Sequence, residues 1–219
     1  MRLRPWGRSG PLVCTADAYV DYLRQHGQLW EKQALLKARC IAGNAPLAED
    51  LLLRLSPIAF DVAETQVREN VREMKQAIES KLAAAGREWG QVKTGQGGIR
   101  DVEFLVQGLQ LIHGRRQPEI RSINTLDAIV RLADHGILQA EEYRCLRTGY
   151  AFLRTIEHAL QLMHNEQMHA LPANPRELAY LARRLDFARS EEFVGHYDQH
   201  CREIRRVFDR HFGRDTMPQ

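Results

Sequence analysis

The chain has 219 residues, of which 44% are hydrophobic and 27% are charged, as in folded proteins and unlike disordered chains. Its 31 basic and 28 acidic side chains leave a net charge of +3, too balanced to favour nucleic acid as a partner. Apolar runs such as Leu51 to Leu53 are too short to span a bilayer, and the first residues show no signal-peptide pattern. We therefore expect a cytoplasmic protein that binds neither membrane nor nucleic acid, with free thiols at Cys14, Cys40, Cys145 and Cys201.

The first quarter of the chain begins with a stretch rich in arginine, glycine and proline, residues 2–11, which predicts a strand end or loop. Thr15 is a suitable N-cap for a helix running to about Leu29. A second helix is expected from Trp30 to Ile41, closed by Gly43. Pro46 then suits the first turn of a third helix, which we expect to end near Leu55.

The rest of the chain shows helical periodicity throughout. Apolar residues at four- and three-residue steps between Val67 and Leu82 predict a long helix, and a glycine-rich connector leads into an apolar helix from Ile99 to about His113. Further helices are predicted over 124–135, 139–165, 176–185 and along the stripe from Phe193 to Phe212. No two-residue alternation persists beyond the N-terminal stretch. The fold class is therefore all-α (mainly), an antiparallel helical bundle with a short N-terminal strand or loop.

The glycine connector, residues 93–98, has the sequence Lys-Thr-Gly-Gln-Gly-Gly and precedes a helix. Glycines allow backbone amides to approach an anion, so a phosphate-binding loop is one interpretation. The lysine precedes the glycines and no Gly-Lys-Ser/Thr follows, so the connector is not a Walker loop. On spacing alone, a structural turn is the favoured interpretation.

The helix after the connector is mostly apolar, and its one polar stripe is formed by Arg100, Glu103, Gln107 and Gln110. Such a stripe on a central helix faces a cleft, a neighbouring domain or water. Asp101 and Glu103 also lie in the first turn, where the helix dipole favours acids, and this explanation is preferred over a metal-binding pair.

Other chemical patterns are weak. His196 and His200 share a helix face, and His164 and His169 flank Glu166, but no further ligands arrive at a recognisable zinc spacing. No catalytic triad or Gly-x-Ser-x-Gly elbow is present, and no Gly-Ser-x-x-Asp-x-Asp strand of the kind that holds metal in nucleotidyl transfer. We therefore expect neither a metal site nor catalytic residues in this chain.

Several sequence blocks nevertheless resemble one family. They are Arg-Leu-Arg-Pro at 2–5, Gly-Arg-Ser-Gly-Pro-Leu-Val at 7–13, Trp-Glu-Lys-Gln-Ala-Leu-Leu-Lys-Ala-Arg at 30–39, Gly-Gly-Ile-Arg-Asp-Val-Glu-Phe-Leu-Val-Gln at 97–107, and Asn-Glu-Gln at 165–167 followed by Leu-Pro at 171–172. Their order and content resemble the glutamine synthetase adenylyltransferases, over nearly the whole chain.

The resemblance implies an enzyme with two nucleotidyltransferase halves. One half adds AMP to a tyrosine of glutamine synthetase, the other removes it by phosphorolysis with release of ADP, and the PII signalling protein sets the balance. The blocks are more similar to the N-terminal, deadenylylating half. Implied partners are glutamine synthetase, the PII protein and the rest of the parent enzyme. Implied cofactors are Mg²⁺ and ATP or ADP in the parent enzyme, with none expected to bind tightly here.

In the family, the three metal-binding carboxylates precede the block that starts at Met1, so we expect them upstream of this chain and the chain alone to be inactive. Residues 1–45 would be the end of a nucleotidyltransferase domain and residues 46–219 a helical bundle domain. Candidate nucleotide or phosphate contacts are Arg2, Arg4 and Lys93. Candidates for the face toward the active-site cleft are Arg100, Asp101, Glu103 and Gln107. The alternative is a helical interaction module that binds glutamine synthetase or a PII protein without nucleotide.

Overall fold

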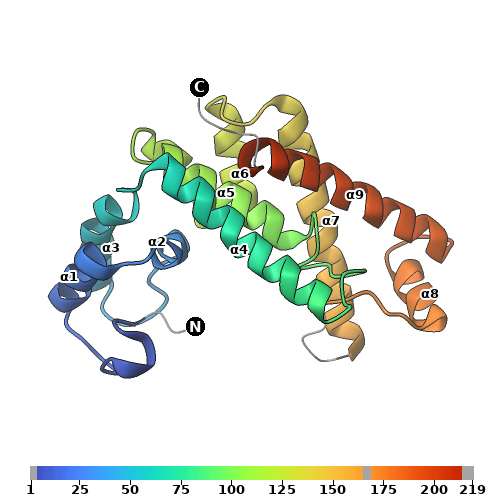
Figure 1. The fold of residues 1–219 in the computed structure, drawn as a ribbon, viewed down its shortest axis with the longest axis horizontal. Helices are drawn as coiled ribbons and strands as arrows, with labels where there is room; N and C mark the ends of the chain where they lie inside the picture. Colours follow the sequence, from blue (N-terminus) through green and yellow to red (C-terminus); the bar gives the residue numbers. More distant parts are fainter. Residues whose placement is uncertain (1–3, 165–168, 214–219) are drawn as a thin grey trace.

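A computed structural model of the chain describes residues 4–164 and 169–213 (Figure 1). Within these two ranges the regular structure is helical, and the β-type pairing is a single antiparallel bridge between Gln91 and Ala170. The all-α prediction is therefore confirmed. Of the strand end or loop expected over residues 2–11, residues 2–3 lie outside the described ranges, and residues 7–9 form a 3₁₀ turn. No helix in the described ranges is long and apolar enough to cross a bilayer.

Three helices form the N-terminal lobe: α1 (Ala16–His26), α2 (Leu29–Leu35) and α3 (Ala45–Ala59). Thr15 caps α1 as predicted, accepting a bond of 3.2 Å from the Ala18 amide, and Asn44 caps α3 through the Leu47 amide at 3.0 Å. The lobe has a small core of its own, made by Val20, Leu23 and Leu55.

Of the three predicted helix ends in this lobe, that of α1 lies at His26 instead of near Leu29, and the other two are wrong. Helix α2 ends at Leu35, where the chain turns. Just after this turn, Lys37 Nζ donates to Ile123 O at 2.8 Å and to Thr125 Oγ1 at 3.1 Å. Helix α3 continues to Ala59 with Pro57 inside its last turn. A proline removes one backbone hydrogen bond there, and burial of Ala59 and Phe60 in the main core offsets the loss.

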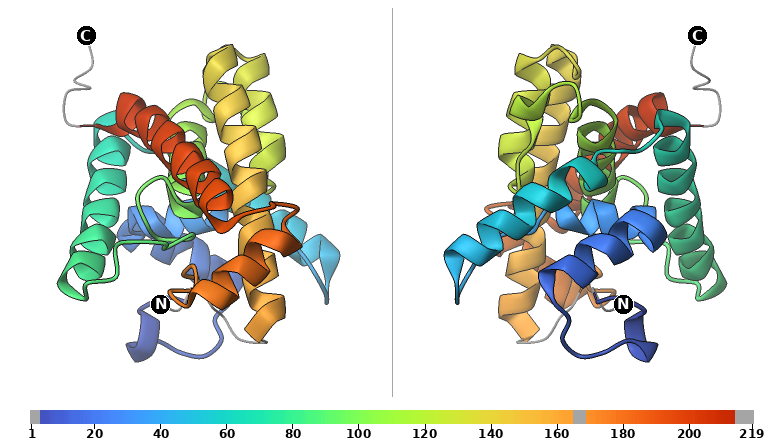
Figure 2. Two further views of the ribbon diagram at one scale, coloured as in Figure 1. Left: turned by 90° about the vertical axis from the view of Figure 1, so that its right-hand side faces the viewer. Right: turned by 90° about the vertical axis from the view of Figure 1, so that its left-hand side faces the viewer.

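Six helices form the bundle: α4 (Glu64–Ala84), α5 (Ile99–His113), α6 (Thr125–Asp134), α7 (Ala140–His164), α8 (Pro175–Arg184) and α9 (Ser190–Phe212). Helices α4 and α5 lie side by side, α6 pairs with α7, and α9 crosses the bundle (Figures 1 and 2). Helix α5 is the centre, contacting α2, α4, α6, α7 and α9. Its residues Val102, Leu105 and Val106 are completely buried.

Helices α5 and α9 approach each other closely in the core at Gly108. A Cβ atom on Gly108 would lie 2.6 Å from Phe212 Cζ, so this position accepts no larger residue without displacing the ring. Phe212 is 1% exposed, and burial of one such side chain is worth roughly 1.5–3 kcal/mol. The C-terminal turn of α9 is therefore part of the core.

The lobe and the bundle are joined by packing and hydrogen bonds. Leu35 packs against both hydrophobic clusters, and Gln33 Nε2 donates to Gln107 Oε1 at 2.7 Å. Helix α3, which follows the expected domain division at residues 45/46, packs against α1 within the lobe. The division itself stays a prediction.

Candidate functional site

The glycine connector is closed by its own hydrogen bonds. The Gly97 amide donates to Asp101 Oδ2 at 2.7 Å, Gly98 to Gly95 O at 3.1 Å, and Ile99 to Val92 O at 3.0 Å. The Arg100 amide donates to the Lys93 carbonyl at 3.0 Å. The amides of Gly97, Gly98, Ile99 and Arg100 are therefore occupied within the protein, which favours the structural turn over a phosphate loop.

The backbone at Gly97 requires a glycine. Its φ is +67°, and a Cβ atom there would sit 1.8 Å from the carbonyl oxygen of Cys201 on α9. Only glycine fits a backbone that approaches another so closely with a positive φ. The connector thus lies between α4, α5 and α9 and contacts all three helices.

Asp101 lies where the connector meets α4 and α9, away from the predicted cleft face. Its side chain is fully buried and forms an ion pair with Lys75 of α4, which is 2% exposed. Lys75 Nζ also donates to Gly95 O at 2.9 Å and lies 3.4 Å from Glu79 Oε1, and Arg205 of α9 pairs with the same glutamate. Burial raises the pKa of Asp101 to about 6, although Lys75, the Gly97 amide and Arg205 lower it. The assignment of Asp101 to the cleft-facing set is corrected to a buried structural role.

The other three cleft-face candidates do share one side of α5. Glu103 Oε1 accepts a bond of 3.2 Å from the Tyr150 hydroxyl on α7, and Gln107 accepts from Gln33 on α2. The Arg100 guanidinium lies 5.9 Å from the Phe104 ring centroid. This polar face is therefore turned toward α2 and α7. Whether it faces a catalytic cleft stays a prediction.

Lys93, the first residue of the connector, contacts α7. Its Nζ lies 3.3 Å from Glu157 Oε1, and Glu157 is 1% exposed. Arg154 pairs with the other oxygen of this glutamate, and His169 Nδ1 lies 3.6 Å from Oε1. Three potential cations thus converge on one buried carboxylate, which supports a structural role for Lys93. Its contact with nucleotide stays a prediction.

Arg4 holds the turn in which it lies. Its Nε donates to Gly7 O at 2.6 Å, and one terminal nitrogen donates to Arg8 O at 3.4 Å. Arg2 lies outside the described residues. The proposed nucleotide contacts of both arginines therefore stay predictions.

The described residues contain no group of three or more His, Cys, Asp and Glu side chains able to hold a metal ion. His196 and His200 instead contact aromatic rings, at centroid distances of 5.3 Å from Phe187 and 4.9 Å from Phe152. Glu166 lies outside the described residues.

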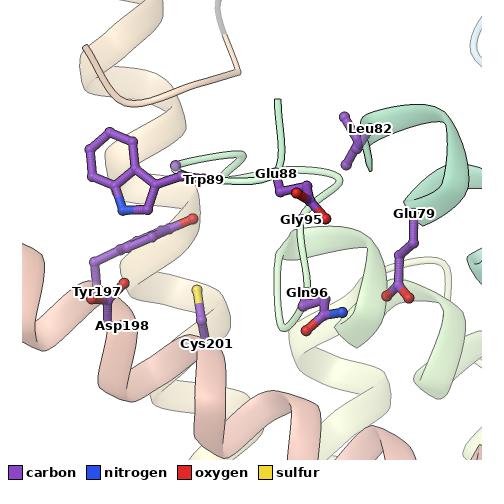
Figure 3. Close-up of a pocket in the computed structure, with 10 residues that line it drawn as sticks. Glu79, Leu82, Glu88, Trp89, Gly95, Gln96, Tyr197, Asp198 and Cys201 are labelled. Carbon is purple, nitrogen blue, oxygen red and sulfur yellow. The ribbon is translucent and has the colours of Figure 1, made fainter. Parts of the chain in front are cut away.

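A pocket that the sequence did not predict lies next to the connector, with Gly95 and Gln96 in its lining (Figure 3). Its volume is about 240 Å³, and its lining includes Trp89, Tyr197 and Cys201. Figure 3 shows the Trp89 and Tyr197 rings next to each other, with Glu79 on the opposite side. The lining also carries Glu88 and Asp198, so its charge disfavours an anion such as a nucleotide. Its parts come from residues 79–96 and from residues 197–201 of α9, two distant segments that no local pattern connects.

Comparisons with known proteins find similar sequences over nearly the whole chain. Residues 1–54 match a family model described as glutamate-ammonia ligase adenylyltransferase, and residues 65–212 match one described as GlnD PII-uridylyltransferase. The chain is 37% identical, over 98% of its length, to a bifunctional glutamine synthetase adenylyltransferase/adenylyl-removing enzyme from Streptomyces avermitilis. It spans 22% of that relative's length.

The two matched segments follow one another along the chain and meet in space where Gln33 contacts Gln107. With the helical fold and the blocks at 30–39 and 97–107, they show that the chain belongs to the glutamine synthetase adenylyltransferase family.

Proposed function

We propose that this chain is a helical part of an enzyme that adds AMP to glutamine synthetase or removes it. One observation carries the proposal, namely the 37% identity over 98% of the chain to a bifunctional adenylyltransferase/adenylyl-removing enzyme. In this role glutamine synthetase is the protein substrate, ATP or ADP with Mg²⁺ takes part in the reaction, and a PII protein regulates it. By resemblance of the 97–107 and 165–172 blocks, the chain belongs to the deadenylylating half.

The contribution of the chain's own residues is positioning. Helix α2 belongs to the segment matched by the adenylyltransferase model, and α5 to the segment matched by the second model. Gln33 and Gln107 join the two helices, and Lys37 joins the lobe to the segment before α6. The bundle would therefore hold the nucleotidyltransferase part at a fixed angle, with Arg100 and Glu103 turned toward it. Arg2 and Arg4 would contact the nucleotide.

The chain by itself is expected to be inactive, because its 219 residues contain no Gly-Ser-x-x-Asp-x-Asp pattern to hold metal. The test is incubation of the chain with adenylylated glutamine synthetase, phosphate and magnesium. We expect no ADP above the level of a blank without protein. Release of ADP in proportion to the chain's concentration would contradict this expectation.

Nucleotide binding is tested by titrating the chain with ATP or ADP in a calorimeter. We expect weak binding that Arg4→Ala abolishes. Arg8→Ala is the matched control, because Arg8 is exposed in the same turn and its side chain has no hydrogen-bond or ion-pair partner among the described residues. A pull-down with glutamine synthetase is done in parallel. Partner binding with no nucleotide binding at all would favour the interaction module over the enzyme part.

A further inference from the structure

A second pocket, of about 240 Å³, lies where the N-terminal lobe meets the bundle. Its walls are apolar and come from both parts of the molecule, with Leu36, Leu52 and Leu55 from the lobe and Ile123 from the segment before α6. A dry cavity of about 150 Å³ can hold a benzene molecule, so this space accommodates a somewhat larger apolar body. Of the polar stripe predicted on α5, Gln110 lines this pocket, and Arg100, Glu103 and Gln107 do not.

The pocket also contains a buried donor with no partner. Gln110, on α5, is 0% exposed and lines the pocket, and its Nε2 has no hydrogen-bond partner in the described part of the chain. The orientation of the amide is fixed, because Oε1 accepts a bond of 2.8 Å from the backbone N–H of Ser122. Reversing the amide would place two donors against each other. An unsatisfied buried donor is costly, so an acceptor is expected at this point.

The same pocket is lined by a cation, Arg121. The Arg121 guanidinium lies 3.9 Å from the Phe60 ring centroid, and it donates to Gly114 O and Ser56 Oγ, both at 2.8 Å. Those bonds use Nε and Nη1, and Nη2 has no hydrogen-bond partner within the described ranges. The lining residues include no Asp or Glu, and Glu119, the acid that interacts electrostatically with Arg121, lies outside the lining. The polar part of the pocket is therefore positive and donating.

From this geometry we infer that the pocket binds a small aliphatic carboxylate, with its branched apolar body between α2 and α3 and its carboxylate on Gln110 Nε2 and Arg121. The volume suits one body of side-chain size and not a helix. The head group must accept hydrogen bonds and carry negative charge, which a neutral apolar compound does not do. The inference does not depend on the proposed enzymatic role.

The experiment is a calorimetric or NMR titration of the chain with 4-methylpentanoate, 4-methylpentanamide and acetate. The acid is expected to bind at least tenfold more tightly than the amide, because the amide keeps a carbonyl acceptor and loses the charge. Acetate is expected to bind far more weakly, since each buried methylene strengthens binding about fourfold. Equal affinity for acid and amide would overturn the inference, and so would a lack of binding by the acid. The latter result would mean that a buried water satisfies Gln110.

Two variants test whether the ligand binds in this pocket. Leu52→Phe fills the pocket from its lobe side and is expected to weaken binding of the acid at least tenfold. The matched control is Leu53→Phe, because Leu53 is 75% exposed and does not line the pocket. Gln110→Met removes the donor and is expected to weaken binding of the acid about tenfold while leaving that of the amide closer to its original value. If Leu52→Phe folds and binds as well as Leu53→Phe, the acid binds elsewhere and the inference fails.

Discussion

The buried Lys75–Asp101 pair gives the sharpest prediction about stability. Lys75→Met leaves a fully buried carboxylate without its main partner and removes the donor that Lys75 gives to Gly95 O. Breaking a buried ion pair by deleting one partner costs about 3–5 kcal/mol. Since a folded domain is stable by only about 5–15 kcal/mol, chemical denaturation should show the loss plainly. Lys81→Met, at an exposed position of the same helix, is the control and should change stability by less than about 0.5 kcal/mol.

The pH dependence of this variant has a definite sign. Burial raises the folded-state pKa of Asp101 to about 6, above its value of about 4 in the unfolded chain. The stability that Asp101 contributes is therefore present below about pH 4 and is lost as the pH rises to about 6. Without Lys75 the pKa rises further, so the loss continues above pH 6 and the gap to the parent protein widens by up to about 1.4 kcal/mol per pH unit.

A second substitution tests the cause of the loss. Lys75→Met combined with Asp101→Asn removes both charges and keeps an acceptor for the Gly97 amide, so it should recover part of the stability. The reasoning is refuted if Lys75→Met costs less than about 1 kcal/mol and its gap to the parent protein is the same at pH 6 and pH 8.

Two further predictions concern the backbone. Gly97→Ala should cost well over 3 kcal/mol or prevent folding, because it meets a backbone carbonyl at 1.8 Å, whereas Gly136→Ala, with φ +70° and open space, should cost only about 1–2 kcal/mol. Thermal unfolding of both distinguishes the effects, and equal losses would contradict the close contact with α9. Asn124→Ala should cost about 1 kcal/mol, because its side chain caps two amides at the start of α6. Asn124→Ser should recover most of the lost stability. If Asn124→Ala is as stable as the parent protein, the cap contributes nothing and the prediction is wrong.

Helix starts were predictable where a side chain caps the first turn. Thr15, Asn44 and Asn124 are local signals, and each lies next to its helix in the structure. Helix ends were less predictable, because they depend on distant contacts. The turn after Leu35 depends on a bond from Lys37 to a carbonyl 86 residues away.

The polar stripe on α5 was also predictable, since helical spacing alone places Arg100, Glu103 and Gln107 on one side. The role of Asp101 was not, because its partners come from α4 and α9. The pair of Lys93 with Glu157 and the pocket of Figure 3 were missed for the same reason. In each case the sequence contains one side of the contact without any local sign of the other.

The contact between Gly108 and Phe212 has a consequence for the order of synthesis. A ribosome releases α5 about a hundred residues before the ring that covers its glycine face. Until α9 emerges, an apolar stripe around Gly108 remains open to water and to other nascent chains. The N-terminal lobe and α4 are made before α9, and they do not supply the ring that covers Gly108.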